Sequence, residues 1–482
     1  MTVTYCRIVR AAIALLALAA VPGMASADIS GRDRVYTADQ SSNTVSVYDP
    51  STNRLLGQIV LGQPRPDVLS PIYRGQANVH GLGFSPDHRT LAVISTASNA
   101  VTFIDTATNR VKGTTYVGRS PHEGFFTPDG KEFWCVVRGE NYLSVIDPVT
   151  FKETRRIIVA DGPGMVLFRP DGQVAFVVSS FTPEVDVVDT HTYQIVKRIP
   201  VVSPFSPNLA VTKDGDVWMT HKDVGKVTVI DGQRFEVRTV LDTGLVTNHV
   251  NFIDSPQGRL AYVSIGGEDV VKVFTRETSP KLIATIPTGA LPHGLWPSDD
   301  GTRIYVALEN GDGVSVIDTA TQKEIARIPG GQAPQALVYI SNAVPGGPGT
   351  DNLQPLGSGP RPVTLQLRPS AAGSEARGFL VIRSLGPVDG LDISVFHLTP
   401  NHTYGVYASA NASGAADGLR HVTTVRTNAM GGAAGQAIGA LRDALASTGG
   451  TDARTPPQGA RYIVVAAIGE GVVSPVLVGE VR

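Results

Sequence analysis

Cysteine is scarce in this chain: its 482 residues contain two, and Cys6 lies in a basic and apolar N-terminal segment. The other, Cys135, stands between Trp134 and Val136 in the alternating pattern of a β-strand. Once the N-terminal segment is removed, an intramolecular disulfide is excluded, so the fold must depend on burial and sheet closure. Apolar surroundings raise the pKa of a thiol, and we therefore interpret Cys135 as a buried core residue rather than a nucleophile.

Long apolar runs are confined to the N-terminus. Residues 1–27 combine Arg7 and Arg10 with an apolar stretch at 11–21 and a small-residue site at 25–27, which is the pattern of a secretory signal peptide. No other stretch reaches about 18 consecutive apolar residues, so we expect no integral membrane segment. The expected location is periplasmic or secreted.

An excess of positive charge is also lacking. Without residues 1–27 the chain keeps 39 basic and 43 acidic residues, a net charge of −4. Nucleic-acid binding needs clustered positive charge, so we expect a small-molecule ligand or a periplasmic protein as partner, and no nucleic acid. The sequence also lacks Gly-x-Ser-x-Gly, phosphate-loop, dinucleotide, His-x-x-His and Cys-x-x-Cys motifs.

A phrase of five alternating residues recurs seven times. The last residues of the seven copies are Asp49, Asp105, Asp147, Asp189, Asp231, Thr275 and Asp318. They are separated by 56, 42, 42, 42, 44 and 43 residues. A period near 42 with four strand-like runs per repeat is typical of a β-propeller blade. We therefore predict an all-β fold with a seven-bladed β-propeller over residues 28–343, and we interpret the repeated Asp as a backbone-clamping turn residue rather than a calcium ligand.

The two ends of the repeat region are incomplete in complementary ways. Val35–Ala38 reads as the second strand of a blade with no inner strand before it, and Gln335–Ile340 reads as an inner strand with no partner after it. Pairing the two would complete one blade and remove an open sheet edge. The sequence therefore predicts a propeller closed by strands from both of its ends.

The repeat period stops after the propeller. Residues 344–362 form a Gly/Pro-rich linker, and residues 363–482 contain short alternating runs that predict a small immunoglobulin-like β-sandwich. The Ala/Gly-rich stretch 433–447 suggests a short helix. Because the linker is long and rich in glycine, we expect the C-terminal domain to move relative to the propeller.

Histidines recur at one position of the repeat, at the entry to the inner strands. Four of the ten histidines occupy this position, namely His80, His122, His249 and His293, and Gln335 takes it in the closing strand. We predict that these side chains line the mouth of the central channel. Neutral imidazoles from separate strands can ligate Cu or Zn. Hydrogen bonding to loop backbone and a polar small-molecule pocket are the alternatives, and Glu123 would act as a neighbour of any metal.

Loops on the same face supply the remaining candidates. The first repeat interval exceeds the period by 14 residues, and the extra residues, with Arg65 and Asp67, fall within 63–79. Arg138, His221 and Glu309 lie in predicted connections between the second and third strands of their blades. Loops at a channel mouth commonly carry function, so we include all five residues in the predicted ligand site.

The repeats also resemble a known family. Pro292-His293-Gly294, Pro128-Asp129-Gly130, Tyr305-Val306-Ala307 and the phrase at 314–318 are similar to those of the YVTN family of seven-bladed propeller proteins. The resemblance covers about residues 33–340. It implies the fold and leaves the activity open. Our interpretation is an exported binding or scaffold protein that engages a ligand or protein partner at the channel mouth. Enzymatic alternatives that the resemblance leaves open are a lactonase-like hydrolase and a metal- or Cu-dependent oxidoreductase.

Overall fold

The computed structural model describes residues 29–62, 77–255, 258–357, 362–384, 389–412, 419–439, 441, 462–468 and 474–481. The expected signal peptide, Arg65 and Asp67 lie outside the described residues. Within them, no helix is long and apolar enough to cross a membrane.

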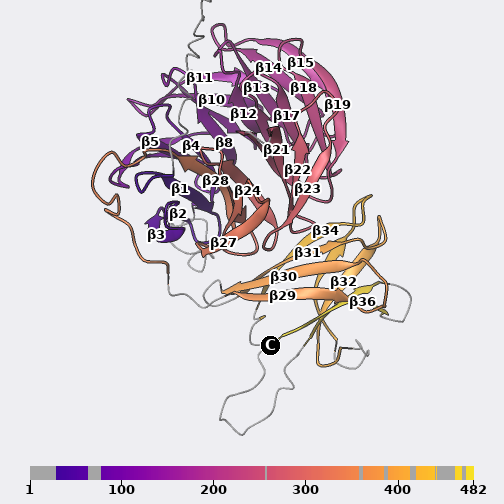
Figure 1. Cartoon of the computed structure of the whole chain (residues 1–482). Helices are drawn as coiled ribbons and strands as arrows, with labels where there is room; N and C mark the ends of the chain where they lie inside the picture. The colour runs from indigo at the N-terminus through magenta and orange to yellow at the C-terminus, as the bar shows by residue number, and fades with distance from the viewer. Residues whose placement is uncertain are drawn as a thin grey trace, which may run out of the picture.

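Seven four-stranded antiparallel sheets are arranged in a ring around a central axis in the described part of the chain (Figure 1). From the channel outward, blade 1 consists of β28 (Pro334–Ile340), β1 (Arg34–Asp39), β2 (Thr44–Asp49) and β3 (Arg54–Val60). Blade 2 has β4 (Val79–Phe84), β5 (Thr90–Ser95), β6 (Ala100–Asp105) and β7 (Val111–Tyr116). Blade 3 has β8 (Pro121–Phe126), β9 (Phe133–Val137), β10 (Tyr142–Asp147) and β11 (Lys152–Ile158). Blade 4 has β12 (Pro163–Phe168), β13 (Val174–Ser179), β14 (Glu184–Asp189) and β15 (Ile195–Pro200).

The remaining three blades repeat this order. Blade 5 has β16 (Leu209–Val211), β17 (Val217–His221), β18 (Lys226–Asp231) and β19 (Glu236–Asp242). Blade 6 has β20 (Thr247–Ser255), β21 (Gly258–Ile265), β22 (Val270–Thr275) and β23 (Leu282–Pro287). Blade 7 has β24 (Pro292–Pro297), β25 (Arg303–Leu308), β26 (Gly313–Asp318) and β27 (Lys323–Pro329). The inner strands of successive blades contact one another around the whole ring, so the predicted seven-bladed propeller is confirmed.

Strands from both ends of the repeat region close the ring. β1 pairs with β28 in antiparallel register, with Arg34 opposite Ile340 and Tyr36 opposite Val338. On its other side β1 pairs with β2. The predicted closure is therefore confirmed, and the open edges that an unpaired β1 would present are absent from this blade.

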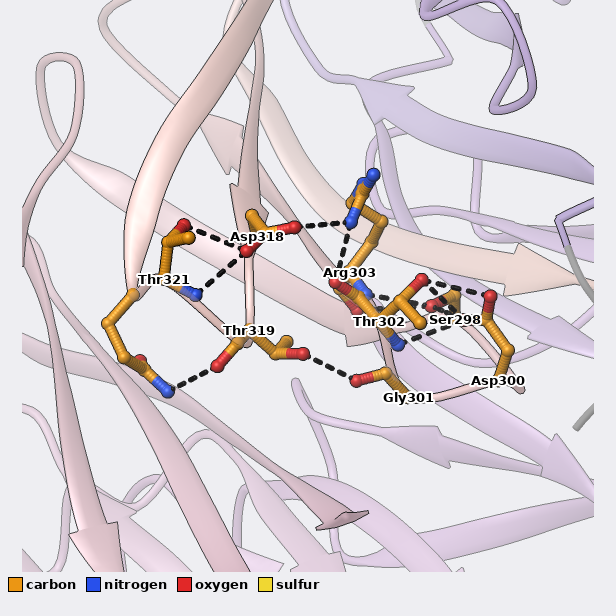
Figure 2. A network of polar contacts seen from close by, with 9 residues as sticks. Ser298, Asp300, Gly301, Thr302, Arg303, Asp318, Thr319 and Thr321 are labelled. Atoms are coloured by element: carbon orange, nitrogen blue, oxygen red, sulfur yellow. Dashed lines mark hydrogen bonds and ion pairs between the residues drawn. The ribbon is translucent and has the colours of Figure 1, made fainter. Parts of the chain in front are cut away.

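The repeated Asp clamps the turn that follows the third strand. In blade 7, Oδ1 of Asp318 accepts hydrogen bonds from the N–H and hydroxyl of Thr321, both at 2.8 Å, and Oδ2 accepts one from Arg303 at 2.6 Å (Figure 2). The neighbouring hydroxyl of Thr319 donates to the carbonyl of Gly301 at 2.7 Å, which ties this turn to the hairpin between β24 and β25. Equivalent bonds to backbone N–H groups are made by Asp49, Asp105, Asp147, Asp189 and Asp231. These carboxylates are turn residues, as predicted.

The blade interiors are apolar and tightly buried. Cys135 on β9 is fully buried beside Phe133 and is free of any disulfide. Burial raises the pKa of its thiol above the ordinary value, so the interpretation of Cys135 as a core residue is confirmed.

The C-terminal domain is an eight-stranded sheet that folds over on itself. Its strands follow the order β33-β32-β35-β36-β29-β30-β31-β34. They are β29 (Val363–Pro369), β30 (Arg377–Ser384), β31 (Asp389–Phe396), β32 (Thr403–Ser409), β33 (Arg420–Arg426), β34 (Ala433–Gly439), β35 (Tyr462–Ala467) and β36 (Ser474–Glu480). The two halves share one core that includes Ile393 from β31 and Val465 from β35. An immunoglobulin-like connection pattern stays a prediction.

The expected helix at 433–447 is wrong for residues 433–439. Residues 433–439 form β34, which pairs with β31 over its whole length. The high alanine content suggested a helix, but pairing satisfies the backbone groups along the edge of β31, and this tertiary requirement overrides local propensity.

The linker lies on the propeller surface over the part that the structure describes. The carbonyl of Pro348 accepts a hydrogen bond from Arg34 at 2.6 Å, and that of Gly349 accepts one from Asn109 at 3.0 Å. Gln354 then forms an antiparallel bridge with Gln58 on β3. The linker, expected to let the C-terminal domain move, is therefore bound to the propeller at these points, because side chains of blades 1 and 2 and the backbone of β3 pair with its backbone groups.

The C-terminal domain also contacts three loops of the propeller, one each in blades 5, 6 and 7 (Figure 1). The Arg383 side chain is 3% exposed and pairs with Asp312 at 2.6 Å. Arg377 donates to the carbonyl of Gly267, and Asn428 donates to that of Asp223 at 3.4 Å. Each of these loops joins the second and third strands of its blade.

Candidate functional site

The inner strands all begin at one end of the ring, which is the channel mouth, and the four that carry the predicted histidines have a bulge there. The pairing register shifts between Val79 and Gly81, between Pro121 and Gly124, between Thr247 and Val250, and between Pro292 and Leu295. A bulge breaks the strict alternation of a strand and re-aims side chains. The repeats thus place His80, His122, His249 and His293 at equivalent irregular positions beside the channel mouth.

The first pair of histidines is His80 and His122, on the adjacent strands β4 and β8. Their Nε2 atoms are 2.7 Å apart, and both side chains are more than 90% buried. The Nδ1–H of His122 donates to the carbonyl of Gly164 at 2.6 Å, so its Nε2 is an acceptor. His80 therefore donates its Nε2–H, and its buried Nδ1 has no hydrogen-bond partner in the described residues.

The second pair is His249 and His293, whose ring centroids are 4.8 Å apart. His249 accepts a hydrogen bond at Nδ1 from the Asn208 amide at 3.1 Å, so its proton lies on Nε2. His293 donates its Nδ1–H to the carbonyl of Gln335 at 3.0 Å and keeps a lone pair on Nε2. The structure thus divides the predicted set of four histidines into two pairs with different hydrogen-bond partners.

Two charged side chains from the loops lie beside His293, and a third, Arg138, belongs to a loop at the same end of the ring. Nζ of Lys222 is 3.4 Å from Nε2 of His293, and Oε2 of Glu309 is 4.0 Å from the same nitrogen. The guanidinium of Arg138 lies near the rings of Phe181 and Phe205, 5.9 and 5.5 Å from their centroids. In the described part of the chain, neither Lys222 nor Arg138 forms an ion pair with a carboxylate within 4.0 Å.

Burial and mutual repulsion keep the imidazoles neutral. Burial lowers the pKa of His80 and of His249 to about 3, with smaller contributions from nearby cations. The pKa values of His122 and His293 also lie well below the usual range, chiefly because of burial. At pH 7 the four rings offer lone pairs and N–H groups without charge. The mouth therefore combines neutral imidazoles with two cations and the carboxylate of Glu309.

Burial also acts on the two cations. It lowers the pKa of Lys222, an effect that Glu309 opposes and Arg138 reinforces. Burial is the cause of the lowered pKa of Arg138 as well. A positive charge that is removed from water without a paired carboxylate is unfavourable, and an anionic ligand would relieve that cost.

Not every predicted residue belongs to this group. His221 is fully buried inside blade 5, where the hydroxyls of Ser206 and Thr228 lie 2.9 and 2.7 Å from its two nitrogens. It is therefore held as a structural residue of that blade. Gln335 lies at the mouth, and its buried side-chain amide nitrogen has no described hydrogen-bond partner.

Lys222 was missed as a site residue, although a signal for it exists. Arg138, Lys222 and Glu309 each directly follow the second strand of their blade. The seven residues in this position are Gln40, Thr96, Arg138, Ser180, Lys222, Gly266 and Glu309. They are spaced along the chain in the same way as the repeated Asp. Comparing the residue at this one position in all seven repeats would therefore have identified Lys222 together with Arg138. Ser180 adds a buried hydroxyl without a described partner, close to Gly164.

Two surface cavities lie away from the histidines. One of about 250 Å³ is bordered by Asp269 of the propeller and by Arg377 and Phe396 of the C-terminal domain. The other, of about 590 Å³, lies over blades 5 and 6 and is lined by charged residues such as Asp231 and Arg238, which pair with each other. Because those charges are already paired, the unpaired cations make the channel mouth the stronger candidate.

No protein-family model matches the chain, and no curated protein matches it. Among solved structures, Kuenenia stuttgartiensis hydrazine synthase matches with a TM-score of 0.52 and 21% identity, over 56% of this chain and 92% of that one. A functionally unknown protein from Desulfotomaculum acetoxidans matches with a TM-score of 0.54 and 13% identity, over 64% and 98% of the two chains. The periplasmic gluconolactonase of Pseudomonas aeruginosa matches with a TM-score of 0.51 and 17% identity, over 64% and 99%. At these identities the matches show the fold alone, which is a seven-bladed β-propeller.

Proposed function

We propose that this protein is an exported binding protein whose channel mouth takes a small anionic molecule. The observation that carries the proposal is the pair of half-buried cations, Lys222 and Arg138, neither of which forms a described ion pair; Nζ of Lys222 lies 3.4 Å from Nε2 of His293, with the carboxylate of Glu309 beside the same ring. Export rests on the signal-peptide pattern of residues 1–27. The assignment of the repeats to the YVTN family is part of the same proposal.

The chemistry of the site favours a ligand rich in oxygen atoms. Lys222 and Arg138 would pair with a carboxylate or phosphate, and the Nε2–H of His249 would donate to a further oxygen. The lone pair of His293 would accept from a ligand hydroxyl. Such mixed donors and acceptors orient a polar molecule, while the two charges supply the attraction.

The test is calorimetric titration of the mature protein with gluconate, citrate and phosphate, with glucose as the neutral comparison. We expect one of the anions to bind and glucose not to bind. Lys222→Met and Arg138→Met should each weaken anion binding at least tenfold, whereas Lys226→Met should leave it unchanged because Lys226 already pairs with Asp242 at the surface. Equal binding of glucose, or unchanged affinity in both mouth variants, would contradict the proposal.

A hydrolase is the second candidate, and His293 is the observation that favours it. Its Nδ1–H is held by the Gln335 carbonyl, so Nε2 presents a lone pair as a general base would require. Hydrolysis of a lactone there would leave a carboxylate beside Lys222. The assay is the release of acid from glucono-δ-lactone, and the activity should disappear in His293→Asn; a wild-type rate equal to the spontaneous rate would rule this lactonase candidate out.

A further inference from the structure

The structure brings together three metal-ligating side chains in the wall of the channel mouth, apart from the cations described above. The donor atoms of His80, His122 and Glu123 all lie within 4.8 Å of one another. All three side chains are buried, with exposed fractions of 8, 6 and 4%. We propose that these residues form a binding site for one Zn²⁺ ion, and this inference does not depend on anion binding at Lys222.

The strand bulge explains how two consecutive residues reach one site. In a regular strand, His122 and Glu123 would point to opposite faces of the sheet. The register shift between Pro121 and Gly124 removes that alternation. Glu123 then lies against Gly81 of the neighbouring blade, where a Cβ atom would meet its Oε2 at 2.8 Å. The absence of a side chain at Gly81 is therefore what admits the carboxylate.

The surroundings of the two imidazoles fit metal ligation. The Nδ1–H of His122 is fixed by the Gly164 carbonyl at 2.6 Å, which turns its Nε2 lone pair toward His80 and Glu123. Metal-ligating histidines usually donate their other N–H to a carbonyl or carboxylate in this way. The Nδ1 of His80 is buried without a described partner, so the polar groups of this cluster are incompletely satisfied by the protein alone.

The distances show what ligand binding would change. The two Nε2 atoms are 2.7 Å apart, whereas two nitrogens on tetrahedral zinc are separated by roughly 3.3 Å. The rings must therefore part by about half an ångström when zinc replaces the hydrogen bond between them, and the proton of His80 must move from Nε2 to Nδ1. Glu123 forms no described ion pair with a cationic side chain, so its carboxylate is available as the third ligand.

The choice of metal follows from the donor set. Two imidazoles and one carboxylate suit zinc and leave a fourth position for water or an anion. Calcium and magnesium prefer sites made of oxygen atoms. Copper is the main competitor, because it binds nitrogen ligands more tightly than zinc does.

The experiment uses the mature protein without a polyhistidine tag, treated with a chelator and titrated with Zn²⁺ against a chromogenic competitor. We expect one equivalent of zinc and a zinc-dependent rise in the thermal midpoint. X-ray absorption of the loaded protein should show two imidazole ligands. Glu123→Gln and His122→Gln should each weaken zinc binding at least tenfold.

His249→Gln is the matched control, since His249 occupies the same bulge position in blade 6 but lies outside the proposed set. It should keep the wild-type zinc affinity. Circular dichroism of each variant separates loss of ligands from loss of fold, and the isosteric Glu123→Gln keeps the shape of the side chain. Absence of zinc binding in the wild type, equal loss in His249→Gln, or binding of Cu²⁺ with exclusion of Zn²⁺ would overturn the proposal.

Discussion

Asp39 offers a pH-dependent test of how blade 1 is held together. Its carboxylate is completely buried and accepts hydrogen bonds from the hydroxyls of Thr37, Thr44 and Ser46 at 2.7, 2.9 and 2.7 Å. Burial nevertheless outweighs these bonds and raises the pKa of Asp39 to about 7. The folded protein thus holds a proton on Asp39 at pH values where the unfolded chain has lost it.

The sign and size of the effect follow from linkage. Because the folded-state pKa is raised above the ordinary 3.8, the folded state binds more protons than the unfolded state between about pH 4 and pH 7. Stability contributed by this group is therefore greatest below pH 4 and falls as the pH rises through 7. At 1.36 kcal/mol per pKa unit, the difference corresponds to about 4 kcal/mol.

Asp39→Asn should remove this pH dependence, because an amide does not titrate and the neighbouring hydroxyls can rotate to accept from it. The assay is denaturant unfolding of wild type and variant between pH 4 and pH 8. We expect the variant to lose the downward slope and to be at least as stable as wild type at pH 8. Asp147→Asn is the control: backbone hydrogen bonds lower the pKa of that exposed carboxylate, so its effect should appear only below about pH 4. A wild-type slope that survives in Asp39→Asn would refute the reasoning.

Three further predictions concern closure and domain contacts. Ile340→Ala in the fully buried closing strand should cost about 2–5 kcal/mol of unfolding free energy. The control Ile325→Ala, at a residue 46% exposed on β27, should cost under about 0.5 kcal/mol. Equal costs would contradict closure by β28. Arg383→Met should speed amide hydrogen exchange in the loop that carries Glu309 and Asp312, and Arg327→Met at the surface should not. If the loop exchanges at the same rate in both variants, the ion pair between the domains does not hold that loop. Limited proteolysis should spare residues 344–357 until the propeller unfolds, and rapid cleavage there in the native protein would show that the linker contacts are not maintained.

Much of the architecture could be predicted because propeller repeats leave a strong periodic record. The spacing of Asp49 to Asp318 gives the number of blades, and the unmatched strands at each end give the closure. Each of these features depends on the alternation of apolar residues within a strand and on the residues of its turns, and both can be read from neighbouring positions in the sequence. The turns held by the repeated Asp could be predicted too, because their hydrogen bonds join residues only two or three positions apart.

Other features depend on contacts between distant segments. The strand at 433–439 exists because β31 needs a partner, and the linker is bound because Arg34 and Asn109 meet its carbonyl groups. Neither requirement is visible in the residues of the segment itself.

The candidate site falls between these cases. The histidines could be identified because they recur at one position of the repeat. Their division into two pairs depends on bulges that the alternating pattern does not reveal. Lys222 follows the same phase as Arg138, yet only the folded ring shows that both charges reach the histidines without a carboxylate of their own.

Anion binding at the channel mouth can be located directly, whatever the natural ligand is. Crystals of the mature protein soaked in bromide would give anomalous peaks at each bound ion. We expect a bromide between Lys222 and Arg138 in the wild type and its loss in Lys222→Met, with surface peaks unchanged. Bromide bound at the surface but absent from the mouth of the wild-type protein would contradict it.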